Sequence, residues 1–290
     1  MTFTVVVPAR NRQALIVRAV SSALAQSRPP DAVVVVDDGS TDDTASVAEA
    51  AGARVVRLAT SGGSGPARNA GAAAADSDWI AYLDSDDEWR PDHLEVLEGF
   101  LDGRVLVSSA ASSTSGGVRG LVSPTPVPVT SASVFGALNP LVTSGTAVRR
   151  SALAAAGGFR PLPRAQDFDC WIRVLEQGAG IATGRETVFY HEHGDQVSRN
   201  GDLNRASVLK IIDDAAARPW CTPRLRSDTL ARYLLDDVRT GQRLHEPDRV
   251  RRTLRTAAAR PGVWPALVRL TAVRATGKLR RPAGPAGPPS

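Results

Sequence analysis

Residues 79–89 have the sequence Trp-Ile-Ala-Tyr-Leu-Asp-Ser-Asp-Asp-Glu-Trp, an apolar run that leads directly into a cluster of acids. The run Trp79–Leu83 predicts a strand that is buried on both faces, as strands of parallel sheets are. Three similar runs occur earlier in the chain and predict strands as well: Phe3–Val7, Ala32–Val36 and Arg54–Leu58. The acids therefore follow the fourth strand of a series.

The segments between these strands have helical patterns. Three helices are predicted, at Arg12–Gln26, Asp42–Ala51 and Pro66–Ala75, and apolar residues recur at helical spacing in the first of them. Alternating strands and helices predict a doubly wound α/β sheet, on which ligands bind at the carboxyl ends of the strands. Because polar clusters follow several of the predicted strands, we expect the functional site at that edge.

The charge of the chain is uneven. Residues 1–204 carry 17 Lys and Arg against 23 Asp and Glu, whereas residues 205–290 carry 18 against 7. The basic C-terminal part suits either an anionic partner or a solvated Arg-rich helical face. We predict one large domain over residues 1–204, a basic helical extension over 205–279, and a disordered Pro/Gly-rich tail over 280–290.

The cysteine content and the lack of long apolar runs indicate the cellular compartment. Two cysteines, Cys170 and Cys221, form neither a disulfide framework nor a zinc site and fit a reducing compartment. No signal peptide is visible, and no apolar run approaches the roughly 18 residues that a membrane span needs. We therefore expect a cytoplasmic protein. The Ser-, Thr-, Gly- and Pro-rich segment 111–137 predicts a long loop with room for one strand.

The first polar cluster is Pro8-Ala-Arg-Asn11, at the end of the first strand. A dinucleotide-binding protein has G-x-G-x-x-G at this place, and the pattern is missing. Gly62-Gly-Ser-Gly-Pro66 likewise lacks the Gly-Lys-Ser/Thr ending of a P-loop. Both absences argue against simple NAD and ATP sites. Taken alone, Pro8–Asn11 also suits a helix entry with Asn11 as N-cap.

The second cluster is Asp37-Asp-Gly-Ser-Thr-Asp-Asp43, directly after the second strand. Two adjacent carboxylates at a strand end are costly unless something uses them. A carboxylate here can accept a hydrogen bond from a nucleobase N–H or a ribose hydroxyl. The same residues suit a turn at Gly39 and Ser40 followed by a helix N-cap, and the two interpretations are compatible.

The third cluster contains Asp84 and Asp86, which point to the same side of an extended segment. They can converge on one hard cation, and Mg²⁺ and Mn²⁺ take oxygen ligands while keeping positions open for phosphates. An isolated Asp-x-Asp more often belongs to a solvated acidic turn. The presence of two further polar clusters at the ends of neighbouring strands favours the metal site over a solvated turn.

Together these motifs resemble the ordered signature of glycosyltransferase family 2. The Gln166–Arg173 segment resembles the family's Glu-Asp-x-x-x-Trp acceptor motif, and Tyr190–Gly194 with Ser198 resembles its closing His-containing segment. The resemblance covers roughly residues 2–200 and implies the GT-A fold. The other matching segments, in chain order, are Pro8–Asn11, Asp37–Asp42, Gly65–Gly71, Asp84–Asp87 and Gly157–Phe159.

The resemblance implies a role for each matching position. Asp38 would contact the base, Arg68 would lie near the base or diphosphate, and Asp86 would bind Mn²⁺ or Mg²⁺ directly. Asp84 and His193 would complete the metal site, although a lone histidine is more often a surface or packed residue. The nucleotide-sugar site would comprise Pro8, Ala9, Arg10, Asn11, Asp37, Asp38, Arg68, Asp84, Ser85 and Asp86.

Asp167 matches the general base of the family. The residue pattern agrees, because the apolar residues between Phe168 and Leu175 share one helix face and leave Asp167 off it, free to point into a cleft. Capping of a helix N-terminus would by itself also explain an Asp at this position. The preceding residue is Gln166, where the family usually has Glu, so we expect the acceptor contacts to differ from those of the family.

The sequence thus predicts an inverting glycosyltransferase with a nucleotide-diphosphate-sugar donor, a UDP-sugar being the first choice. The acceptor would be a hydroxyl of a saccharide, a lipid-linked glycan or a small molecule. One alternative is a nucleotidyltransferase of related α/β layout, which would usually need a Gly-rich, Lys-containing loop after the first strand. Another is an inactive nucleotide-sugar-binding module, against which the intact Asp84, Asp86 and Asp167 argue.

The C-terminal region lies outside the resemblance. It has no aromatic platform or known motif for nucleic acid, so we predict no nucleic-acid partner. Its apolar residues are interleaved with Arg and Lys, which suits a peripheral contact with the inner face of the cell membrane. The residues concerned are Trp264, Leu267, Leu270, Val273, Arg269, Arg274, Lys278, Arg280 and Arg281.

Overall fold

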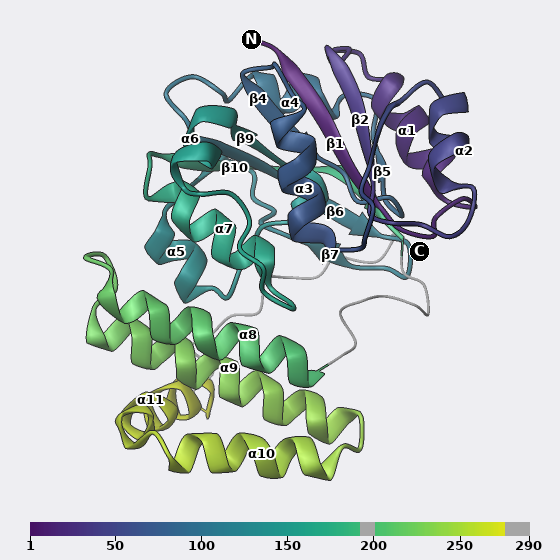
Figure 1. Cartoon of the computed structure of the whole chain (residues 1–290). Helices are drawn as coiled ribbons and strands as arrows, with labels where there is room; N and C mark the ends of the chain where they lie inside the picture. Colours follow the sequence, from purple (N-terminus) through teal and green to yellow (C-terminus); the bar gives the residue numbers. More distant parts are fainter. Residues whose placement is uncertain (192–200, 276–290) are drawn as a thin grey trace, which may run out of the picture. The chain divides into compact units, whose positions relative to one another are not determined.

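The computed structural model describes residues 1–191 and 201–275, which form two compact units, Met1–Val208 and Leu209–Ser290 (Figure 1). All strands of the described residues belong to the first unit, and the second unit is helical. The predicted domain boundary at residue 204 lies four residues before the end of the first unit. The predicted disordered tail, residues 280–290, lies outside the described residues.

Four parallel strands form one half of the sheet (Figure 1). They are β1 (Phe3–Ala9), β2 (Ala32–Asp37), β3 (Arg54–Arg57) and β4 (Trp79–Tyr82), in the spatial order β3–β2–β1–β4. The valine-rich strands β1 and β2 are buried along nearly their whole length, as their sequences predict. The carboxyl ends of β1, β2 and β4 consequently meet at one edge.

The other half of the sheet runs in both directions. Strand β9 (Thr146–Arg149) is antiparallel to both β4 and β6 (Leu106–Ser113). Strand β10 (Gly180–Tyr190) is parallel to β6, and β5 (Glu88–Trp89) is antiparallel to β10. The mixed α/β sheet confirms the predicted fold class.

The prediction of a long loop over residues 111–137 is wrong. The segment contains the end of β6, then β7 (Val118–Arg119), β8 (Val127–Val129) and helix α5 (Ser131–Gly136). Strand β7 pairs with β6 and β8 pairs with β10. Strands of two or three residues have no period to detect, and their backbone hydrogen bonds come from a partner strand rather than from the local pattern.

Helices cover both faces of the sheet (Figure 1). On one face, α1 (Ile16–Leu24), α2 (Thr44–Ala50) and α4 (His93–Glu98) share a core with Phe3, Val5 and Val7 of β1. On the other face lie α3 (Ser64–Ala73) and α7 (Gln166–Leu175), while α6 (Arg150–Ala155) follows β9. All three predicted helices before β4 are present: α1 and α2 are shorter than predicted, and α3 has the predicted length but begins two residues earlier.

Gly71 lets α3 lie close to β1. A Cβ atom at this position would be 2.4 Å from Cγ1 of Val6, a distance at which one of the two elements would have to move. Only glycine permits such an approach of a helix backbone to a buried strand. This contact helps to place the N-terminal half of α3, which carries Arg68, at the carboxyl edge of the sheet.

The second unit is helical and is described as far as residue 275. It contains the end of α8 (Gly201–Asp214), then α9 (Pro223–Arg243), α10 (Pro247–Ala258) and α11 (Trp264–Ala275). The buried Asp237 of α9 accepts hydrogen bonds from Arg249 and Thr253 of α10, which joins the two helices. Among the described helices, none is long and apolar enough to cross a bilayer.

A buried histidine in the first unit makes stability depend on pH. His93 is fully buried; its Nδ1 lies 2.6 Å from the Thr187 hydroxyl, and its ring stacks on Trp89. Burial lowers the pKa of His93 to about 3. Below a pH of about 6.5, the ordinary pKa of histidine, the unfolded chain binds a proton at His93 whereas the folded protein does not. The contribution of His93 to stability is therefore present above that pH and is lost as the pH falls.

We therefore expect the protein to lose about 2 kcal/mol of stability between pH 7 and pH 5 through this residue. His93→Asn keeps a polar group near the Nδ1 position but does not titrate, so it should remove that part of the pH dependence. Urea denaturation at both pH values measures it. His245→Asn, at an exposed histidine of the second unit, is the matched control. An equal pH dependence in wild type and His93→Asn would contradict the assignment.

Candidate functional site

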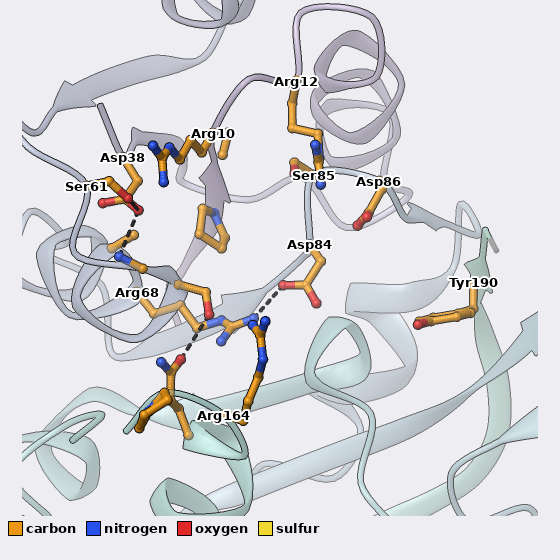
Figure 2. Close-up of a pocket in the computed structure, with 17 residues that line it drawn as sticks. Arg10, Arg12, Asp38, Ser61, Arg68, Asp84, Ser85, Asp86, Arg164 and Tyr190 are labelled. Carbon is orange, nitrogen blue, oxygen red and sulfur yellow. Dashed lines mark hydrogen bonds and ion pairs between the residues drawn. The ribbon is translucent and has the colours of Figure 1, made fainter. Parts of the chain in front are cut away.

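The loops after β1, β2 and β4 surround a cavity of about 490 Å³ (Figure 2). The start of α3 and the loop before α7 complete its walls. It lies at the carboxyl edge of the parallel strands, where the sequence predicted a ligand site. The lining residues are Pro8, Ala9, Arg10, Arg12, Asp38, Ser61, Gly63, Ser64, Ala67, Arg68, Asp84, Ser85, Asp86, Pro163, Arg164, Gln166 and Tyr190.

Asp38 lines the cavity and also holds the loop that precedes α3. Its carboxylate accepts hydrogen bonds from the Ser61 hydroxyl at 2.8 Å, from the Gly62 amide at 2.7 Å and from the Gly63 amide at 2.8 Å. The neighbouring Asp37 does not line the cavity and instead accepts a hydrogen bond from the Ser40 amide at 3.0 Å. The second cluster therefore combines a turn with one cavity-facing carboxylate.

Asn11 does not line the cavity and does not cap α1. The N-cap of α1 is Leu15, so the helix-entry interpretation of Asn11 is wrong. With φ at 51°, Asn11 donates its amide to Ser40 Oγ and accepts from the Thr41 amide through Oδ1, both at 2.9 Å. It thus joins the loops after β1 and β2. Arg12 lines the cavity in its place, a position that the motif did not single out.

Asp84 forms an ion pair with the buried Arg68. The distance from Arg68 Nη2 to Asp84 Oδ1 is 2.6 Å, and the Arg68 side chain is only 8% exposed (Figure 2). Burial acts to lower the pKa of Arg68, but the Asp84 carboxylate outweighs it and the pKa is raised. Arg68 therefore stays charged and compensates one of the two acids of the Asp84-Ser85-Asp86 motif.

A second, smaller cavity of about 290 Å³ adjoins Asp84 and Tyr190, which line both cavities. Burial, together with the charge of Asp84, raises the pKa of Asp87 to about 8. Asp87 lies 2.5 Å from the Ser144 hydroxyl, and that hydroxyl accepts a hydrogen bond from the Asp84 amide. The other lining residues are Asp87, Arg119, Gly120, Asn139, Pro140, Leu141, Val142, Thr143, Ser144 and Asp167.

Asp167 lies in the first turn of α7 and lines this smaller cavity, not the larger one. Its Oδ2 accepts hydrogen bonds from Asn139 Nδ2 at 2.9 Å and Thr143 Oγ1 at 3.1 Å. Neither donor was predicted from the sequence, since they belong to no motif and reach Asp167 only through the fold. Asn139 has a left-handed backbone with φ at 60°, an uncommon conformation that often marks functional sites.

The two acids of α7, Asp167 and Asp169, lie in different environments. Phe168, Trp171 and Leu175 are buried, as the predicted apolar face requires. Asp169 is buried too, and it forms ion pairs with Arg160 and Arg173. These pairs attach α7 to the preceding segment and leave Asp167 as the acid of this helix that faces a cavity.

Gln166 links the two helices that border the larger cavity. Its Oε1 accepts a hydrogen bond from Ser64 Oγ at 2.9 Å, and its Nε2 donates to the Leu162 carbonyl. His193, predicted as a metal ligand, lies outside the described residues. Within residues 1–191 and 201–275, no group of three His, Cys, Asp or Glu side chains could hold a metal, so the site offers two aspartates, Asp84 and Asp86.

Comparisons with known proteins agree with this geometry. Residues 4–154 match the family model described as Glycosyl transferase family 2. The chain is 32% identical to the succinoglycan biosynthesis protein ExoU of Rhizobium meliloti over 206 residues, 60% of this chain and 57% of that protein. It is 29% identical over 229 residues to the amylovoran biosynthesis glycosyltransferase AmsB of Erwinia amylovora, 72% of this chain and 75% of that protein.

A further similarity, to the succinoglycan biosynthesis protein ExoO of Rhizobium meliloti, reaches 50% identity over 97 residues, 32% of this chain. The matches span 28% of ExoO and 57% of ExoU, so a large part of each relative has no counterpart in the alignment. Among solved structures, the fold is similar to S. aureus TarS 1-349 in complex with UDP-GlcNAc. The TM-score is 0.71 at 20% identity, over 97% of this chain and 93% of that chain.

The family model covers more than half of the chain, and it includes the loops after β1, β2 and β4 that line the larger cavity. The mixed sheet and the order of its polar clusters have the arrangement that the sequence motifs predicted. The chain belongs to glycosyltransferase family 2.

Proposed function

We propose that this chain is an inverting glycosyltransferase that transfers a sugar from a nucleotide-diphosphate sugar to an acceptor hydroxyl. The observation that carries this proposal is the junction of two cavities at Asp84 and Tyr190. The larger cavity contains Asp86, and the smaller one contains Asp167. A donor in the first and an acceptor in the second would bring the reacting atoms together at this junction.

The larger cavity suits the donor. Its volume of about 490 Å³ lies within the ordinary range for small-molecule sites. Pro8, Ala9 and Asp38 would hold the nucleoside, while Arg68 and Arg10 would face the diphosphate. The similar TarS structure contains UDP-GlcNAc, which supports a UDP-sugar as the donor class.

Asp84 and Asp86 would hold Mn²⁺ or Mg²⁺. The residues fit such an ion, because Arg68 binds Asp84 only through Oδ1, and Asp84 Oδ2 accepts no hydrogen bond within the part of the chain that the structure describes. These ions usually take one or two protein carboxylates and complete their shell with water and substrate phosphates. A bound ion would neutralise the charge that builds up on the leaving nucleoside diphosphate.

Asp167 would act as the general base. In the proposed displacement the acceptor oxygen forms a bond to the anomeric carbon, the bond from that carbon to the diphosphate breaks, and the hydroxyl proton passes to Asp167. Asn139 and Thr143 both donate to Oδ2 of Asp167, which orients the carboxylate and leaves Oδ1 for the acceptor. Attack from the side opposite the leaving group inverts the anomeric centre.

The acceptor is proposed to be a saccharide. The smaller cavity offers amide, hydroxyl and carboxylate groups. Tyr190 and Arg119 also line it, with the Arg119 guanidinium carbon over the Tyr190 ring, 4.1 Å from its centre. Polar groups beside an aromatic ring suit a sugar. The relatives named for succinoglycan and amylovoran biosynthesis support the same class, with a glycan chain as the molecule that grows.

A donor screen tests the proposed function. We expect the protein with Mn²⁺ to hydrolyse one of a panel of UDP-, dTDP- and GDP-sugars slowly, with release of the nucleoside diphosphate. Glycosyltransferases do this when water takes the place of the acceptor. Release of pyrophosphate from a sugar phosphate and a nucleoside triphosphate would instead identify a nucleotidyltransferase.

The second unit is proposed to contact an anionic membrane surface. Trp264 and Val268, four residues apart on α11, are 49% and 64% exposed, and Leu254 on α10 is 55% exposed. Helix α10 also carries four arginines. Exposed apolar residues beside a basic face suit binding at a lipid interface.

Vesicle sedimentation of the full chain tests this contact. The double variant Trp264→Ser/Val268→Ser should bind phosphatidylglycerol-containing vesicles several-fold more weakly than wild type, since apolar burial and charge attraction act together. The matched control is Val122→Ser, at an exposed valine of the first unit. Equal sedimentation of wild type and the double variant would remove the proposed contact.

A further inference from the structure

Arg164 lies in the loop before α7, and its side chain lines the larger cavity. The next residue, Ala165, has φ at 54°, a left-handed conformation that residues other than glycine rarely adopt. The Arg164 amide donates to Ser207 Oγ at 3.2 Å, which holds the backbone from the other side. In Figure 2 the Arg164 side chain points towards the Arg68–Asp84 ion pair. The loop thus directs a guanidinium into the cavity.

Arg164 has no ion pair and no side-chain hydrogen bond within residues 1–191 and 201–275, and its Nε is shielded from solvent. Two buried arginines, by contrast, do have acidic partners. Arg68 pairs with Asp84, and Arg173 pairs with Asp169. The shielded Nε of Arg164 is costly, because this donor has lost water without gaining another partner.

The departure from the family motif at Gln166 bears on this charge. A Glu at this position would place a carboxylate in the cavity wall two residues from Arg164. Gln166 is neutral, and its Oε1 is engaged by Ser64 Oγ at 2.9 Å. The exchange therefore leaves the positive charge of Arg164 without an acid on its own loop.

We propose that Arg164 binds an anionic group of the donor. A guanidinium presents a planar fork of N–H donors that matches phosphate and carboxylate oxygens. The group would be either the diphosphate that every donor of this class contains or a carboxylate on the transferred sugar. The inference rests on the proposed function, since it takes the larger cavity as the donor site.

Calorimetric titration in the presence of Mn²⁺ tests the inference, with uridine, UDP, UDP-glucose and UDP-glucuronate as ligands. Arg164→Gln should bind the anionic ligand about 10- to 100-fold more weakly than wild type and bind uridine unchanged. Arg164→Lys should recover part of the loss. Gln166→Glu should weaken binding in the same direction, because it restores an acid beside Arg164. Arg185→Gln, at an exposed arginine of β10, should change nothing.

The pattern of loss identifies the group. If Arg164→Gln weakens UDP and both UDP-sugars equally, Arg164 binds the diphosphate; if it weakens UDP-glucuronate alone, Arg164 binds a sugar carboxylate. If Arg164→Gln binds all four ligands as the wild type does, or loses uridine to the same extent as the nucleotides, the inference is overturned. A wild-type protein that binds none of the four would overturn the proposed uridine donor and, with it, this inference.

Discussion

Asp167→Asn is expected to lower the rate of sugar transfer by about 10²- to 10⁴-fold, the range that general-base catalysis contributes. The amide has the shape of the carboxylate but cannot take the proton of the acceptor hydroxyl. Because Asp167 lines the smaller cavity and not the larger one, the affinity for the donor should stay within about twofold of wild type. The two measurements are the single-turnover transfer rate and the dissociation constant of the donor.

The neighbouring residues supply the controls for Asp167. Thr143→Val removes one of the two hydrogen bonds to Oδ2, which should slow transfer by about tenfold or less, since a single hydrogen bond contributes about 1 kcal/mol. Asp92→Asn, at a half-buried acid that lines neither cavity, should leave the transfer rate unchanged. Wild-type turnover of Asp167→Asn would show that another group accepts the proton.

Asp86→Ala is expected to remove the metal dependence of donor binding. The wild type should bind UDP far more tightly with Mn²⁺ than with a chelator present, whereas the variant should bind it equally in both conditions. Loss of a group that only supports a metal ligand lowers metal affinity about 10- to 100-fold, so loss of a direct ligand should cost at least about 100-fold. Titration of UDP with and without Mn²⁺ measures this difference.

Asp84→Ala separates the metal site from the ion pair. This change leaves the buried Arg68 without its partner and should lower the free energy of unfolding by about 1–3 kcal/mol in addition to any loss of metal. Asp86→Ala leaves the Arg68–Asp84 ion pair in place, so it should not show this loss of stability. If UDP binding to Asp86→Ala still responds to Mn²⁺ as in the wild type, Asp86 is not a ligand.

Local sequence patterns predicted much of the fold and part of the site. The strands β1 to β4 carry their own signal, because each is a continuous apolar run between turn or helix signals. The acids after β2 and β4 were identified as site residues because polar clusters at the ends of buried strands are otherwise costly. The residue pattern placed Asp167 off the apolar face of its helix, and the structure agrees, since Asp167 lines the smaller cavity.

Tertiary structure alone decided which partners these residues have. Asn139 and Thr143 approach Asp167 because β9 returns the chain antiparallel to β4, and Arg68 meets Asp84 because Gly71 lets α3 lie against β1. Arg164 lines the cavity from a loop whose next residue, Ala165, has a left-handed backbone that the sequence did not predict. The sequence by itself determined the parallel strands and the acids at their ends, since both follow from the chemistry of neighbouring residues. The fold decided the contacts of Arg68 with Asp84, Asn139 with Asp167 and Ser64 with Gln166, since they join residues 16 to 102 positions apart and no local pattern records such contacts.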